Sequence, residues 1–253
     1  MNNEITNVMD DNSVGRLYNI IKKLKEVGGA NAEDSFCKVF SLERGDKVSI
    51  FNCYAELYKL CSLGINEIEQ LNPKNVHKFK RTLNNVIEGL SKVYFNAMEN
   101  VLNNGMDKFN DYFSDKLMIE LEYCADYLSE NSDEGIIEDD KIQQLIKEIN
   151  DMIKDIMDSR LDDELEKLLV YQLNNIRESL LKYKFYGSKG IETSIETTLG
   201  SLILNKEKAT DSKSIDAVNK IFKIMGKINT IIGFSRNSKD LLESICKFFI
   251  SNK

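Results

Sequence analysis

The chain has 253 residues, of which 42% are hydrophobic and 30% are charged, a composition typical of globular rather than disordered proteins. No run of about 18 apolar residues occurs, and no basic region followed by an apolar stretch opens the chain, so we expect neither a transmembrane helix nor a signal peptide. With a formal net charge of −7 and a single proline, Pro73, the composition predicts a soluble, helix-rich, cytoplasmic protein.

Apolar residues recur every three or four positions along the first third of the chain, which is the period of an amphipathic helix. A first helix is predicted over about 12–27 and ends at Gly28-Gly29. A short helix around Phe36 follows, and a longer one begins near Asp46 and ends at Asn72-Pro73. The apolar face predicted for the longer helix consists of Phe51, Tyr54, Tyr58, Cys61, Ile65 and Ile68.

The most regular pattern lies in the next segment, where apolar residues form a heptad stripe over about three heptads. Its members are Val76, Phe79, Leu83, Val86, Leu90, Val93 and Ala97. Asn103-Asn104-Gly105 ends this helix. A single further helix is predicted to carry Phe109, Phe113, Leu117, Leu121, Cys124 and Leu128, and residues 131–135 form a loop.

The second half of the chain shows the same period. Helices are predicted around 142–156, 165–180, 191–203, 218–228 and 241–249. Asp162 or Asp163 caps the second of these helices, and a tight turn at 186–190 leads into the third. No window alternates with period two for long enough to indicate a strand.

These patterns predict an all-α fold, an irregular multi-helix bundle of about eight to ten helices with no sheet. We divide it into an N-terminal helical half, 1–135, and a C-terminal helical half, 136–253. The two halves are expected to form one continuous helical fold, with the polar stretch 205–213 as a linker.

The residues that usually carry catalysis or bind metals are scarce. His77 is the only histidine, and it lies in a basic helix start where we interpret it as a surface histidine or a helix histidine with satisfied hydrogen bonds. The five cysteines form no C-x-x-C pair and are interpreted as reduced, mostly buried thiols. The acidic runs 138–140 and 162–164 lack the spacing of a calcium loop and are interpreted as helix starts. We therefore predict no catalytic residue, no metal site and no cofactor.

Two basic segments are candidate sites for an anion or a partner. The first interleaves lysines with aromatic residues at 182–190 and offers Lys182, Lys184 and Lys189. The second is a basic amphipathic helix with Lys220, Lys223 and Lys227. For both, we favour a structural interpretation: a helix–helix turn for the first and a bundle helix with solvated lysines for the second.

The charge is also unevenly distributed along the chain. Acids and bases number 14 and 13 over residues 1–107, 19 and 7 over 108–167, and 8 and 14 over 168–253. We favour packing of the acidic middle against the basic C-terminal third, the alternative being that each recruits a partner of opposite charge.

Three segments carry a resemblance to a known group: CKVFSL (37–42), LEYCADYLSE (121–130) and the block 161–204. Together they resemble a widespread group of uncharacterised bacterial helical proteins. The match is specific over 161–204, where a leucine-rich helix, an aromatic-basic turn and a second helix follow one another. The resemblance implies an intracellular bacterial helical protein and supplies no activity.

The leading hypothesis is a non-enzymatic helical module that binds another protein, in a bacterial stress, mobile-element or phage-defence setting. Homo-oligomers are possible partners, and nucleic acid is disfavoured. One alternative is an enzyme acting on nucleic acid or a nucleotide through the 182–190 turn. Another is a membrane-active effector that makes peripheral contact through residues 214–250.

Overall fold

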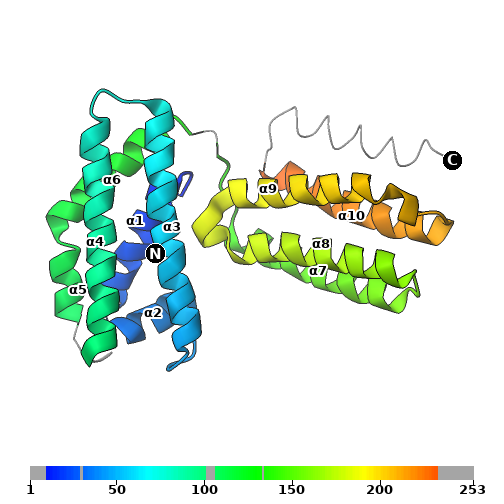
Figure 1. The fold of residues 1–253 in the computed structure, drawn as a ribbon, viewed down its shortest axis with the longest axis horizontal. Helices are drawn as coiled ribbons and strands as arrows, with labels where there is room; N and C mark the ends of the chain where they lie inside the picture. Colours follow the sequence, from blue (N-terminus) through cyan, green and yellow to red (C-terminus); the bar gives the residue numbers. More distant parts are fainter. Residues whose placement is uncertain (1–9, 29–30, 101–105, 133, 233–253) are drawn as a thin grey trace, which may run out of the picture. The chain divides into compact units, whose positions relative to one another are not determined.

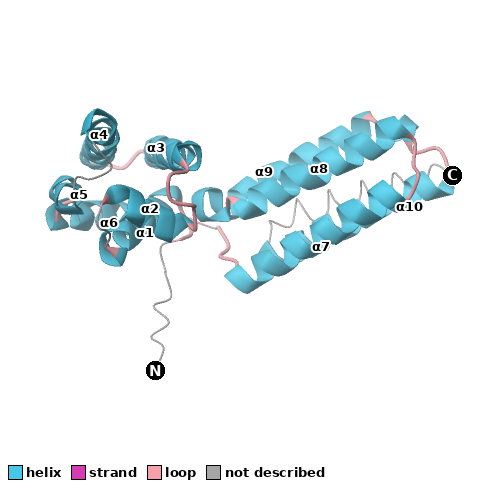
Figure 2. Cartoon of the chain, turned by 90° about the horizontal axis from the view of Figure 1, so that it is seen from below, coloured by secondary structure: helices cyan, strands magenta, loops and turns pink. Residues whose placement is uncertain are grey.

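The structure is a computed structural model that describes residues 10–28, 31–100, 106–132 and 134–232, without the side chains of 95–100, 106 and 107. These residues form ten α-helices and one 3₁₀ turn, with no strand among them, which confirms the predicted all-α fold (Figure 1). The chain divides into two compact units, residues 1–133 and 134–253. Figure 2 shows the described helices and the described loops between them.

Unit 1 contains six described helices. They are α1 (Ser13–Val27), α2 (Ala32–Phe40), α3 (Lys47–Leu71), α4 (Val76–Asn100), α5 (Met106–Tyr112) and α6 (Asp115–Ser129). Helix α1 contacts α2, α3 and α6, while α4 packs between α3 and α6. The four longest helices therefore enclose the core of this unit.

The heptad stripe on α4 lies in this core, as predicted. Phe79, Leu83, Val86, Leu90 and Val93 are all buried, and Val76 is half-buried. Ala97 and the predicted end at 103–105 lie outside the described side chains. Opposite the stripe, Gly64 of α3 allows a close approach of α1, because a Cβ there would lie 2.5 Å from a methyl carbon of Val14.

Two details of unit 1 differ from the sequence prediction. The buried face of α3 is rotated from the predicted one, so Phe51 is 52% exposed and the core instead receives Ile50, Leu57 and Leu60. The segment predicted as one helix over 109–128 is two, α5 and α6. Ser114 separates them, because its hydroxyl accepts a hydrogen bond from the Leu117 amide at 3.4 Å and caps α6.

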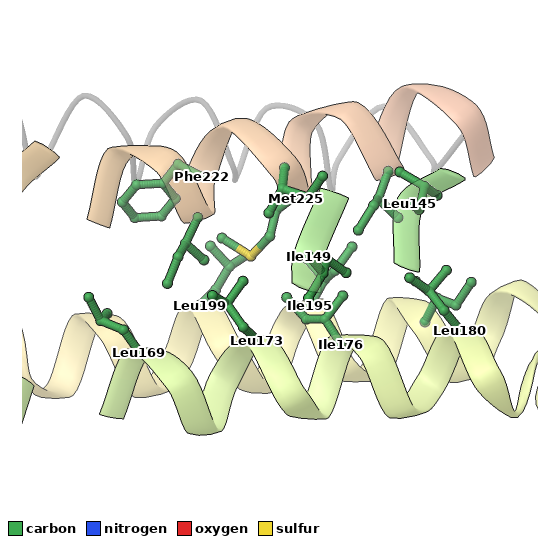
Figure 3. Close-up of a cluster of buried hydrophobic side chains, with 14 of the residues drawn as sticks. Leu145, Ile149, Leu169, Leu173, Ile176, Leu180, Ile195, Leu199, Phe222 and Met225 are labelled. Carbon is green, nitrogen blue, oxygen red and sulfur yellow. The ribbon is translucent and has the colours of Figure 1, made fainter. Parts of the chain in front are cut away.

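The described part of unit 2, residues 134–232, is a bundle of four long helices with short connections. They are α7 (Asp139–Asp158), α8 (Asp163–Leu181), α9 (Tyr183–Leu204) and α10 (Ser212–Ile232), with a 3₁₀ turn at Lys206–Lys208 before the last. The short loops make consecutive helices antiparallel neighbours. Figure 3 shows that side chains from all four helices point toward one another, with Ile149, Leu173, Leu199 and Met225 among them.

The acidic runs of this unit lie at helix starts, as predicted. The Asp162 carboxylate accepts hydrogen bonds from the amides of Glu164 and Leu165 at 3.0 and 3.4 Å, which caps α8. Asp139 and Asp140 occupy the first turn of α7, where carboxylates interact favourably with the helix dipole. The helix predicted over 241–249 lies outside the described residues.

Candidate functional site

The connection that follows α8 in the structure differs from the tight turn predicted at 186–190. Helix α8 ends at Leu181, Lys182 makes the connection, and α9 starts at Tyr183. The chain then bends at Gly187, whose φ of 58° and ψ of −156° are accessible almost only to glycine. The tight turn predicted at 186–190 is therefore a break inside α9 at Gly187, and α8 ends earlier, at Leu181.

The structure does not bring the three lysines of this segment together around a binding site. Lys182 forms an ion pair with Glu178 at 3.4 Å, and the Lys184 and Lys189 side chains are exposed. The backbone amide of Lys189, in the first turn after the bend, donates to the carboxylate of Glu134 at 3.4 Å. A carboxylate of the chain itself thus occupies the helix start where the sequence suggested an external anion.

Two aromatic residues of the same segment, Tyr183 and Phe185, are buried, and one of them, Tyr183, belongs to the core of unit 2. The Tyr183 hydroxyl accepts a hydrogen bond from the buried amide of Ile137 at 2.7 Å. Because their faces are covered, neither ring is available to stack on a base in this structure.

The basic face of α10 meets the acidic helix α7. Lys220 pairs with Asp155 at 3.3 Å, and Lys227 pairs with Glu148. Lys223 is exposed and forms no ion pair with the described residues. Part of the charge asymmetry of the sequence is therefore neutralised inside unit 2, which is the arrangement we favoured.

The apolar side of α10 is also occupied. Ile221, Phe222, Met225 and Ile228 are all buried in the four-helix core. Insertion of this face into a membrane surface would therefore require opening unit 2. Among the described helices, none is both long and apolar enough to cross a membrane.

The groups capable of nucleophilic or metal chemistry are dispersed. His77 is exposed, as predicted. Cys53, Cys61 and Cys124 are free and buried, and burial raises the pKa of Cys53 to about 11 and those of Cys61 and Cys124 to about 12. These thiols stay protonated at neutral pH and are poor nucleophiles. Within the described ranges, no three His, Cys, Asp or Glu side chains gather as a metal site.

A cleft of about 440 Å³ lies in unit 1 between α4 and the α5–α6 corner. Its walls carry three bases and three acids, namely Arg81, Lys92, Lys116, Glu88, Asp111 and Glu120. Lys92 pairs with Glu88 at 2.5 Å, and its ammonium lies 5.7 Å from the centre of the Tyr112 ring. The acids and bases of its walls are equal in number, so the residue types do not favour an ion of either sign.

A surface that we did not predict lies beside this cleft, on α6. Ile119 and Tyr123, one helical turn apart, are 65% and 67% exposed. The Tyr123 ring stacks on the buried Phe79 of α4, with ring centres 6.0 Å apart and planes 21° apart. The Tyr123 ring is therefore packed against the core beneath it.

Carboxylates surround this pair on the same side of α6. Glu122, Asp126 and Glu130 follow at helical spacing, and no ion pair with a described base is found for any of them. Glu122 lies close to Tyr18 of α1. Burial is the main cause that raises the pKa of Tyr18, and the charge of Glu122 is the second. We call Ile119, Tyr123, Glu122, Asp126 and Glu130 the α6 outer face.

The signal for the α6 outer face was present in the sequence. Leu117, Leu121, Cys124 and Leu128 form the core stripe, and Ile119 and Tyr123 fall outside it. Apolar residues off the core stripe of an amphipathic helix are individually common, so their position alone does not identify a binding surface.

No family model, curated protein or solved structure matches this chain. The resemblance to uncharacterised bacterial helical proteins therefore stays a prediction.

Proposed function

We propose that this protein is a non-enzymatic module that binds another protein through the α6 outer face of unit 1. The observation that carries the proposal is the exposure of Ile119 and Tyr123, two large side chains that share one side of a helix. Exposed apolar groups with a polar rim are a common mark of protein-binding surfaces.

The packing of Tyr123 against the core adds support. The Phe79 ring beneath Tyr123 restricts the tyrosine before any partner arrives. Since fixing a side chain on binding costs conformational entropy, a side chain that is already restricted loses less. Tyrosine is also among the residues that contribute most often to binding energy at protein interfaces.

The predicted lysine segments support this choice indirectly. Lys220 and Lys227 pair with α7, and the Glu134 carboxylate lies at the helix start near Lys189. These contacts favour structural roles for the two segments over the nucleotide-binding and membrane-binding alternatives.

The test is affinity purification of the full-length protein from extracts of its native host, in three forms. These are the wild type, an Ile119→Ser/Tyr123→Ser variant, and a control variant, Tyr171→Ser/Leu204→Ser, which removes exposed side chains from unit 2. We expect a protein that is retained by the wild type and the control and lost by the first variant. That protein, once purified, should bind in calorimetry with the same pattern.

Circular dichroism and thermal melting would verify that the three forms fold alike. Equal retention by all three forms, or no retained protein, would contradict the proposed function.

A further inference from the structure

The charges around Ile119 and Tyr123 specify what kind of segment the α6 outer face can accept. Asp126 and Glu130 are exposed, and Glu122 is half-buried beside Tyr18 of α1. Lys116 is the only base in α6, and it lines the neighbouring cleft. Binding therefore brings any partner close to three carboxylates.

We propose, on the basis of the proposed function, that the α6 outer face binds a basic segment of another protein, rich in arginine and lysine and carrying an aliphatic anchor. The aliphatic side chain packs on Ile119. An arginine beside it stacks on the exposed face of Tyr123 and pairs with Asp126, which lies less than one turn further along the helix.

The arrangement also determines which partners are rejected. An acidic segment would place like charges beside Glu122 and Asp126, and such contacts are costly when water is removed. Nucleic acid and anionic lipid carry the same unfavourable charge. Specificity for a basic protein segment thus follows from repulsion as well as from attraction.

The probe for the test is a fluorescein-labelled helical peptide of 14 residues, with leucine at helical spacing and arginine or lysine at most other positions. A second peptide has glutamate in place of every base and keeps the leucines. Binding of both to the full-length protein is measured by fluorescence anisotropy over a range of salt concentrations.

Three variants separate a specific surface from general attraction to an acidic protein. The first, Ile119→Ser/Tyr123→Ser, leaves the net charge unchanged. The second, Glu122→Gln/Asp126→Asn/Glu130→Gln, removes three carboxylates from the α6 outer face. The third, Asp140→Asn/Asp151→Asn/Asp158→Asn, removes three exposed carboxylates from α7 and is the charge-matched control.

We expect the basic peptide to bind the wild type and the α7 control alike. It should bind each of the two α6 variants at least tenfold more weakly, with affinity falling as salt rises. Equal weakening by the α7 control, or tight binding of the acidic peptide, would overturn the inference. If the host partner depends on Ile119 and Tyr123 but docks through an acidic or uncharged segment, the proposed function stands and this inference fails.

Discussion

The backbone amide of Ile137 donates a hydrogen bond to the hydroxyl of Tyr183 at 2.7 Å, and both residues are buried. The bond ties the segment that precedes α7 to the first residue of α9. Since Tyr183 belongs to the segment that the sequence offered as an anion or base site, the bond gives this aromatic residue a structural role within unit 2.

Replacing Tyr183 with phenylalanine should destabilise unit 2 by about 1–3 kcal/mol, because the change leaves a buried N–H group without its acceptor. Urea unfolding followed by circular dichroism measures the loss. The control is Tyr171→Phe, because Tyr171 is 61% exposed and its hydroxyl can be replaced by water without penalty. Equal stability of the Tyr183→Phe protein and the wild type would show that this hydrogen bond is unimportant.

Stability should fall in mild acid. Hydrogen bonds from Ser49, Lys227 and Ser214 hold the pKa values of Asp46, Glu148 and Asp211 below their ordinary values of 3.8, 4.5 and 3.8. The unfolded chain therefore takes up protons at a higher pH than the folded one, so the stabilisation is complete above about pH 5 and is lost as pH falls through the lowered values.

The measurement is the free energy of unfolding in urea between pH 6 and pH 3. An Asp46→Asn/Asp211→Asn variant keeps two side chains that can cap helices but no longer titrate, so its stability should depend less on pH. A wild-type stability that is constant over this range would contradict the role of these carboxylates.

The core of α4 gives a third prediction. Leu90→Asp should cost at least about 3 kcal/mol, because Leu90 is fully buried and the new carboxylate would have no partner there. Ile119→Asp on α6 is the matched control, since Ile119 is 65% exposed and its replacement should change the melting temperature little. Comparable melting temperatures for the two variants would mean that the stripe on α4 is not in the core.

The helices of this protein could largely be predicted from local sequence, because each carries one apolar stripe of helical period. The orientation of α3 could not. Its two neighbouring stripes share Tyr54, Cys61 and Ile68, and the sequence pattern cannot show which of them faces inward. The close approach of Val14 to Gly64 accompanies the observed orientation, and that contact joins residues far apart in sequence.

The candidate sites also depend on contacts between distant residues, which local sequence does not show. The lysines of α10 were visible in the sequence, but their pairing with Asp155 and Glu148 depends on the register between α7 and α10. The α6 outer face was missed because its exposure depends on what the neighbouring helices leave uncovered. The period and composition of the sequence indicate which residues could take part in such a contact. They do not show whether those residues meet in the fold.

The last prediction concerns two of the three glycines of α9, Gly187 and Gly200. Gly187 has a φ of 58° and a ψ of −156°, a region that residues with a Cβ enter only at a cost of roughly 1–3 kcal/mol. Gly187→Ala should therefore lower the stability of unit 2 by about that amount. Gly200 lies in the regular part of the same helix, and a Cβ there would meet no atom within 4 Å. Gly200→Ala should raise stability by about 0.5–1 kcal/mol, because alanine loses less backbone entropy on entering a helix. Urea unfolding of both variants gives the two values. The same substitution is therefore expected to change the free energy of unfolding in opposite directions at the two positions. A stabilising Gly187→Ala would mean that the bend in α9 does not require glycine.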